Sequence, residues 1–187
     1  MSVRIQKAAV LGAGVMGSGI AAHLANAGVP VVLLDIVPPK AADGEDVKSK
    51  AFRNKFALGA LANLKKQKPA PLFTEKALGL IEVGNLEDDL AKLKSCDWVV
   101  EVVKEDLKVK QALFAKVEPN LSPTAIVSSN TSGLSIVGMT EGRSQSFQER
   151  FLVTHFFNPV RYMKLLELVP GPKTKPEVLE GFARFGA

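Results

Sequence analysis

The sequence predicts an α/β fold built on a doubly wound, mostly parallel sheet. Three observations predict it. Short and almost continuously apolar runs alternate with longer segments of helical period, the first run leads directly into a glycine-rich turn, and an acidic residue closes the second run. Continuous Val, Ile and Leu indicate strands that are buried on both faces, and regular alternation of strands with helices produces parallel pairing.

Five strands and three intervening helices follow from this pattern. The apolar runs predict strands over residues 7–12, 29–35, 79–83, 97–103 and 124–130. Between them, apolar residues spaced three or four apart predict helices over residues 15–28, 86–94 and 104–120. A last helix is expected over residues 174–187, with Val178, Leu179, Phe182 and Phe185 on one face.

A basic segment, residues 37–78, interrupts the alternation after the second strand. Apolar residues recur every four positions in it, which predicts an amphipathic helix that is closed by Pro69 and Pro71. The residues expected on its buried face are Phe52, Phe56, Ala60 and Leu64. We therefore expect a helical insertion in one domain that spans residues 1–187.

Composition limits the classes of protein that this chain can represent. It has 187 residues, 47% of them apolar, and a formal charge of +5, which is modest for this length. No stretch reaches the ~18 to 20 apolar residues of a membrane span, and the first residues lack the apolar core of a signal peptide. The single cysteine, Cys96, cannot form an internal disulfide. We expect a soluble, cytoplasmic protein with no membrane partner and no metal site.

The turn after the first strand has the pattern GxGxxG at the start of a helix. Gly12 permits a tight turn, Gly14 lets a pyrophosphate approach the backbone, and Gly17 lets helix and strand pack closely. Asp35, at the end of the second strand, would accept the ribose hydroxyls and repel a 2′-phosphate. This order is typical of a Rossmann-type site for NAD rather than NADP; the alternative is a plain glycine turn with a solvated aspartate. The predicted cofactor-binding residues here are Gly12, Gly14, Val15, Met16, Gly17 and Asp35.

The stretch "THFFNPVRYMKLLELVP", residues 154–170, predicts an antiparallel pair of strands near the C-terminus. If the two strands pair about residue 161, His155 and Glu167 are direct cross-strand partners, with Cβ atoms ~4.5 to 5.5 Å apart. A carboxylate at that distance can fix the tautomer of the imidazole ring. The simpler alternative is that His155 is a structural residue at a strand end.

Three further motifs bring in a family resemblance. With "EVVKEDLKVK" (101–110), "SSNTSGLS" (128–135) and "HFFNPVRYMKLLE" (155–167), the chain resembles the NAD-binding domain of L-3-hydroxyacyl-CoA dehydrogenases over nearly its whole length. The insertion and "GNLEDDLAKLKSCDWVVEVV" (84–103) resemble the long bacterial members, in which an enoyl-CoA hydratase-like region follows. The sequence departs from the family's commoner pattern at Lys104, Asp106 and Gly133.

The resemblance implies NAD-dependent oxidation of L-3-hydroxyacyl-CoA to 3-ketoacyl-CoA in fatty-acid β-oxidation. It makes His155 the catalytic base, Glu167 the residue that holds it, and Ser132 a contact to both substrate and nicotinamide. Asn158 would border the nicotinamide, and Glu105 and Lys110 would lie by its ribose. It also implies that a helical substrate domain, which carries much of a homodimer contact, lies outside these 187 residues.

Several alternatives stay open at this stage. Ser132 could cap a helix that begins near Leu134, and Asn158 could be turn chemistry before Pro159. The basic insertion could bind the phosphates of CoA or be an ordinary solvated face. The whole chain could be a non-catalytic NAD- or CoA-binding module of the same fold. We expect no nucleic-acid partner, because the basic insertion has few aromatic residues on which bases could stack. His23 is interpreted as a surface or packing residue, and Cys96 and Trp98 as packing residues.

Overall fold

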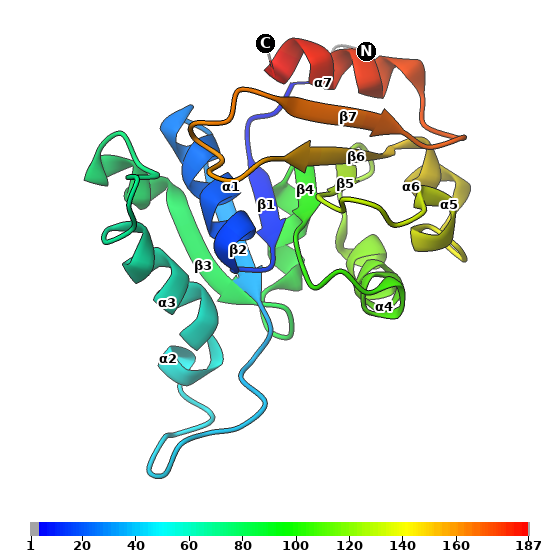
Figure 1. Ribbon diagram of the computed structural model, residues 1–187. Coiled ribbons are helices and arrows are strands. Elements are labelled where there is room, and N and C mark those ends of the chain that lie inside the picture. Colours follow the sequence, from blue (N-terminus) through cyan, green and yellow to red (C-terminus); the bar gives the residue numbers. More distant parts are fainter. Residues whose placement is uncertain (1–3, 187) are drawn as a thin grey trace.

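Seven strands form one sheet in the order β3-β2-β1-β4-β5-β6-β7 in a computed structural model, which describes residues 4–186 (Figure 1). The strands are β1 (Ala8–Leu11), β2 (Val31–Asp35), β3 (Ile81–Asn85), β4 (Trp98–Glu101), β5 (Ile126–Ser129), β6 (Phe151–Phe156) and β7 (Leu166–Pro170). All neighbouring pairs are parallel except β6 and β7, which are antiparallel. The predicted fold class is therefore confirmed, including the antiparallel strand near the C-terminus.

Helices cover both faces of the sheet (Figure 1). On one face lie α1 (Val15–Asn26), α3 (Lys55–Leu64) and α7 (Pro176–Gly186), packed on the side chains of Ala8 and Val10. On the other lie α4 (Leu107–Val117), α5 (Ile136–Met139) and α6 (Gln145–Glu149), and α4 packs on Ala9 and Leu11. Successive residues of a strand point to opposite faces, so each apolar strand contributes to both cores. Among residues 4–186, no helix combines the length and the apolar character that crossing a membrane requires.

The insertion is helical, but it does not form the single helix that the four-residue spacing predicts. It breaks at Asn54 into α2 (Lys50–Arg53) and α3, and the 3₁₀ helix η1 (Glu75–Leu80) follows. Phe56 is 43% exposed, whereas Ala57 is fully buried. A residue repeated every four positions drifts by about 40° per step around a helix of 3.6 residues per turn, so the repeat cannot stay on one face. The prediction for Phe56 was wrong; Phe52, Ala60 and Leu64 are buried as predicted.

The predicted helix over residues 86–94 is replaced by a shorter 3₁₀ helix, η2 (Leu90–Ser95). A second short 3₁₀ helix, η3 (Glu118–Asn120), follows α4 directly.

The predictions for α7 and for the packing residues are confirmed. Val178 and Phe182 of α7 are buried, and the ring of Phe182 lies edge-on to Trp98 at 5.0 Å. Burial raises the pKa of the Cys96 thiol to about 11, as expected for an unreactive core cysteine.

Candidate active site

The polar residues singled out in the sequence lie along one edge of the sheet. The strand order reverses between β1 and β4, and ligands of doubly wound sheets bind outside the carboxyl ends of the strands at such a point. Gly12 follows β1, Asp35 ends β2, Ser132 follows β5 and His155 lies near the end of β6. Because β7 is antiparallel, its first residues bring Glu167 back to the same edge.

The glycine turn has the geometry that a close ligand approach requires. Gly12 has φ +110°, and a Cβ atom there would lie 2.6 Å from the carbonyl oxygen of Val102. A Cβ atom on Gly17 would lie 1.8 Å from the carbonyl oxygen of Gly12, so both positions exclude larger residues. Gly14, in contrast, has nothing within 4 Å of its Cβ position. Gly14 also begins α1 without a side-chain cap, which leaves the first N–H groups of the helix to an anion.

Asp35 connects the end of β2 to this turn. Its Oδ2 atom accepts a hydrogen bond of 2.6 Å from the backbone N–H of Ala13, and its Oδ1 atom accepts one from Ile36. A carboxylate has about four lone-pair positions, so acceptor capacity remains for two hydroxyl groups. Beside it opens a cleft of about 520 Å³. Residues along this cleft include Gly12, Gly14, Asp35, Ile36, Lys104, Val109 and Lys116. Gly12 and Gly14 belong to both, so the glycine turn and this cleft are continuous.

A buried ion pair lies beneath the neighbouring loop. The Nζ atom of Lys110 is 2.7 Å from Oε1 of Glu101, and the two side chains are 1% and 0% exposed. Glu101 also accepts hydrogen bonds from the N–H of Val103 and the hydroxyl of Ser129. Sequence reasoning named Lys110 but missed Glu101. A signal was present, because a charged residue inside the apolar run 97–103 needs a partner when it is buried.

Glu105 joins this pair to the loop that follows β5. Its Oε2 atom lies 3.2 Å from Nζ of Lys110, and its Oε1 atom accepts hydrogen bonds from the N–H of Ser132 and the hydroxyl of Thr131. Burial alone would raise the pKa of Glu105, but the hydrogen bonds from Thr131 and Lys110 outweigh it and hold the pKa below its usual value. Glu105 is therefore an ionised, 46% exposed carboxylate that fixes the backbone at Ser132.

Ser132, His155 and Glu167 form a continuous hydrogen-bonded array. His155 faces Glu167 directly across β6 and β7, so the predicted register is confirmed. The Nδ1 atom of His155 is 2.8 Å from Oε2 of Glu167, and its Nε2 atom is 3.0 Å from Oγ of Ser132. A carboxylate can only accept, so Nδ1–H donates to Glu167, and the lone pair of Nε2 accepts a hydrogen bond from the hydroxyl of Ser132. The array thus presents a basic nitrogen beside a hydroxyl group.

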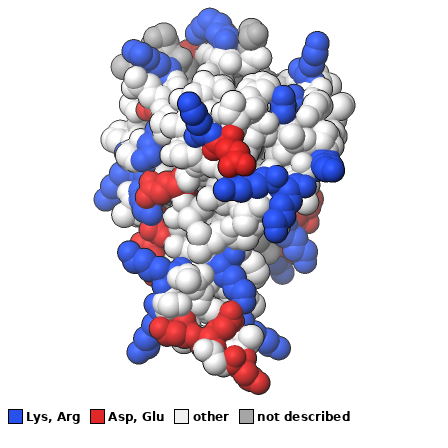
Figure 2. All heavy atoms as spheres, turned by 90° about the vertical axis from the view of Figure 1, so that its left-hand side faces the viewer, with Lys and Arg blue, Asp and Glu red and all other residues white. Residues whose placement is uncertain are grey.

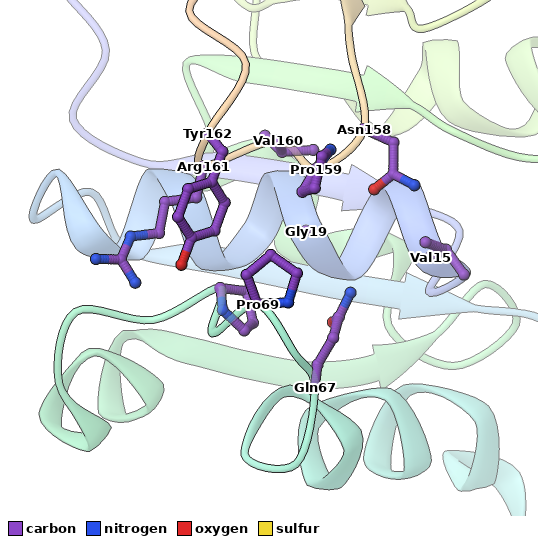
Figure 3. A pocket seen from close by; sticks show the side chains of 10 residues that line it. Val15, Gly19, Gln67, Pro69, Asn158, Pro159, Val160, Arg161 and Tyr162 are labelled. Carbon is purple, nitrogen blue, oxygen red and sulfur yellow. The ribbon is translucent and has the colours of Figure 1, made fainter.

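The sequence also allowed Ser132 to be a helix cap and Asn158 to be a plain turn residue. The nearby helix α5 begins at Ile136 and is capped by Ser135, whose hydroxyl accepts the N–H of Gly138, so Ser132 is not its cap. Asn158 is exposed in the turn between β6 and β7. Figure 3 shows it close to Val15 of the first turn of α1, with which it lines a small pocket. The structure therefore brings Asn158 to the glycine turn and Ser132 to His155.

Comparison with known proteins places the chain among dehydrogenases. Residues 7–187 match the family described as "3-hydroxyacyl-CoA dehydrogenase, NAD binding domain". The chain is 53% identical to a probable 3-hydroxyacyl-CoA dehydrogenase of Bacillus subtilis over 100% of its own length and 24% of that protein. It is 50% identical to one of Deinococcus radiodurans, over 98% of this chain and 50% of that protein.

Comparison with solved structures also finds dehydrogenases of this kind. The crystal structure of 3-hydroxybutyryl-CoA dehydrogenase from Escherichia coli superposes with a TM-score of 0.76 at 31% identity, covering 98% of this chain and 36% of that one. The chain thus spans half or less of the length of these relatives.

Proposed function

The chain belongs to the family of 3-hydroxyacyl-CoA dehydrogenase NAD-binding domains, and on that premise we propose that it is the cofactor domain of an enzyme that oxidises L-3-hydroxyacyl-CoA to 3-ketoacyl-CoA. The observation that carries this proposal is the array of Ser132, His155 and Glu167 at the carboxyl edge of the sheet that also holds the glycine turn. A domain that only bound nucleotide would have no need for an oriented histidine there. Relatives named as fatty acid oxidation complex subunits support a place in fatty-acid β-oxidation.

The cofactor residues in this proposal are those around the glycine turn. The N–H groups at the start of α1, from Val15 to Gly17, would bind the pyrophosphate, and Asp35 would accept the hydroxyls of the adenosine ribose. Asn158 would border the nicotinamide. Glu105 would contact the ribose of the nicotinamide half directly. Lys110 is buried, so it would act indirectly, through its ion pair with the Glu105 carboxylate. NAD, when bound, supplies the acceptor for the hydride that leaves C3 of the substrate.

The chemical step assigned to His155 follows from its tautomer. Nε2 would accept the proton of the 3-hydroxyl group, and Glu167 would stabilise the imidazolium that forms. The hydroxyl of Ser132, 3.0 Å from Nε2 before substrate binds, would donate a hydrogen bond to the same substrate oxygen. Glu105 supports this arrangement because it holds the backbone N–H of Ser132.

The insertion is proposed to face the CoA part of the substrate. A cleft of about 500 Å³ separates α3 from the start of α1, and Lys66 lies along it with Gly14 and Val15. Figure 2 views the molecule from the insertion's side and shows Lys and Arg side chains mixed with carboxylates. Lys55 and Lys65, for example, are paired with Glu45 and Glu75. Lys66 lines the cleft, so it is the lysine of the insertion that we propose to bind a phosphate of CoA.

The remaining parts of the enzyme are proposed to lie in the rest of the gene product. They would include the helical domain that closes over the acyl chain and supplies contacts for a homodimer. Exposed apolar side chains of the β6–β7 turn and of β7 are compatible with such a cover, among them Met163 at 46%, Leu165 at 56% and Val169 at 47%.

Reduction of acetoacetyl-CoA tests the proposal. With NADH, the full-length gene product should reduce acetoacetyl-CoA, while residues 1–187 alone should bind NADH but turn over much more slowly. An open cleft loses the substrate orientation and the water exclusion on which the reaction depends. A full-length protein that binds NADH yet reduces no 3-ketoacyl-CoA would support a non-catalytic module instead.

A further inference from the structure

A short segment of the insertion is held in place by side chains rather than by regular secondary structure. We call residues 65–74, between α3 and η1, the connecting segment. Three consecutive carbonyl groups in its middle, those of Ala70, Pro71 and Leu72, all accept hydrogen bonds from side chains elsewhere in the fold. Their donors lie about 45 to 90 residues away in sequence, so the segment is positioned by tertiary contacts.

Two of the donors come from the turn that follows the catalytic strand. Nη1 of Arg161 donates to the carbonyl of Ala70 at 2.7 Å and to that of Leu72 at 3.0 Å, and the hydroxyl of Tyr162 donates to Ala70 at 3.0 Å. The guanidinium of Arg161 also lies 4.3 Å from the ring centre of Phe73, within the range of a cation–π contact. Arginine suits this position because its planar head can donate several bonds at once.

The third donor lies on α1. Nδ2 of Asn26 donates to the carbonyl of Pro71 at 2.8 Å, and its Oδ1 atom accepts the N–H of Phe73 at 2.9 Å. The turn itself rests on α1 as well, because Val160 is buried and a Cβ atom on Gly19 would lie 3.1 Å from Val160 Cγ2. The connecting segment, α1 and the turn therefore form one contact region.

Side chains of the turn and of the connecting segment lie together over α1. In Figure 3 the ring of Tyr162 extends from the turn toward Pro69, and Arg161 extends over α1 beside it. Gln67 and Asn158 line the same small pocket from the segment and from the turn. Gln67 and its neighbour Lys66 also line the cleft between α3 and the start of α1. Arg161 thus joins the connecting segment, which begins at that cleft, to the turn that follows β6, the strand of His155.

We propose that Arg161, with Tyr162, is a positioning residue that fixes the insertion relative to the reaction site and so favours thioesters that carry the CoA nucleotide. This inference rests on the proposed function. The nucleotide of CoA carries the phosphate charges of the substrate, and Lys66, at the start of the connecting segment, lines the cleft beside the glycine turn. A short thioester that lacks the nucleotide would contact the reaction site but not the insertion. Its binding would therefore not depend on the connecting segment.

The test compares Arg161→Met, Arg161→Lys and a control, Lys164→Met, in the full-length protein. Lys164 is exposed on the same turn, so its replacement removes the same charge without the contacts. Arg161→Met should raise KM for acetoacetyl-CoA about tenfold, equivalent to about 1.4 kcal/mol. Its kcat, and both constants for S-acetoacetyl-N-acetylcysteamine, should stay near the wild-type values. Arg161→Lys should recover part of the loss, and Lys164→Met should behave as wild type.

A second measurement is independent of turnover. Hydrogen exchange in residues 65–74 should become faster in Arg161→Met and stay unchanged in Lys164→Met, and calorimetry should show weaker binding of coenzyme A itself. Unchanged exchange in Arg161→Met, or an equal loss of kcat/KM for both thioesters, would overturn the inference. If the wild-type protein reduces no acetoacetyl-CoA, the proposed function fails, but exchange and coenzyme A binding still decide whether Arg161 positions the insertion.

Discussion

Among single residues, spacing in the sequence predicts the contact between His155 and Glu167 but not the contact between Lys110 and Glu101. The pairing of His155 with Glu167 could be predicted because antiparallel strands about a known centre have a fixed register. The burial of Lys110 could not, because its partner Glu101 lies on a strand and Lys110 on a helix, and no simple period joins them. The roles of these residues stay proposals, but their positions define which substitutions are informative.

The preference for NAD over NADP is expected to depend on Asp35. The protein should bind NADH more tightly than NADPH, because the Asp35 carboxylate would accept ribose hydroxyls and repel a 2′-phosphate. Asp35→Asn should weaken NADH binding by about tenfold or more, as expected when a hydrogen bond to a charged group is lost. Fluorescence titration measures both, with Asp43→Asn in an exposed loop as the control for charge. Equal affinity of the wild type for NADH and NADPH would remove Asp35 from this role.

Lys110 should matter for stability far more than its neighbours do. Lys110→Met leaves the carboxylate of Glu101 buried without its cation, and the free energy of unfolding should fall by about 3 to 5 kcal/mol. The double variant Glu101→Gln/Lys110→Met should recover part of that loss. Urea unfolding at neutral pH provides the comparison, with Lys108→Met as an exposed control on the same helix. A loss in Lys110→Met no larger than in the control would contradict the buried pair.

His23 should make the fold sensitive to acid. Burial lowers its pKa below the ordinary value of 6.5, and its Nδ1 atom is buried without a hydrogen-bond partner among residues 4–186. The unfolded chain therefore binds a proton at a higher pH than the folded chain, so this contribution to stability is lost as the pH falls from about 6.5. Urea unfolding measures the free energy of unfolding of His23→Leu minus that of the wild type. This difference should increase as the pH is lowered from about 7.5 to about 5, because only the wild type has this histidine to protonate. A constant difference would show that His23 does not titrate on unfolding.

At the scale of elements, periodicity predicts which helices exist better than it predicts their faces. The helices α1, α4 and α7 were predicted, because apolar residues recur in them at helical spacing and pack on the sheet. The insertion was predicted less well. Nothing in a four-residue repeat signals the break at Asn54, and the segment 86–94 is too short for its period to distinguish an α-helix from the 3₁₀ helix η2.

The observed face of α3 can be tested with two substitutions. Leu64 is 2% exposed and packs in the core that α1 and the sheet share, so Leu64→Ala should lower the free energy of unfolding by about 2 to 5 kcal/mol. Phe56 is 43% exposed, so Phe56→Ala should cost less than about 1 kcal/mol although it removes a larger side chain. Urea unfolding of both variants would contradict this packing if Phe56→Ala had the larger effect.

In the whole molecule, the alternation of strands and helices along the chain was sufficient to predict the doubly wound, mostly parallel sheet. The strand alternation determines a parallel sheet, and the carboxyl ends of parallel strands meet at one edge. The position of the insertion could not be predicted, since it depends on contacts such as Arg161 with Ala70, which are 91 residues apart in sequence. Local patterns carry no information about such distant pairs.

Turnover by His155→Gln in the full-length protein shows whether His155 is the catalytic base. If Nε2 of His155 accepts the hydroxyl proton, or returns it in the reverse direction, kcat for acetoacetyl-CoA reduction should fall by ~10² to 10⁴-fold. The affinity for NADH should stay unchanged, because the glycine turn follows β1 and Asp35 ends β2, whereas His155 lies on β6. His23→Gln, at the chain's other histidine, should keep near-normal turnover. Near-normal kcat in His155→Gln would show that Nε2 of His155 does not accept the hydroxyl proton.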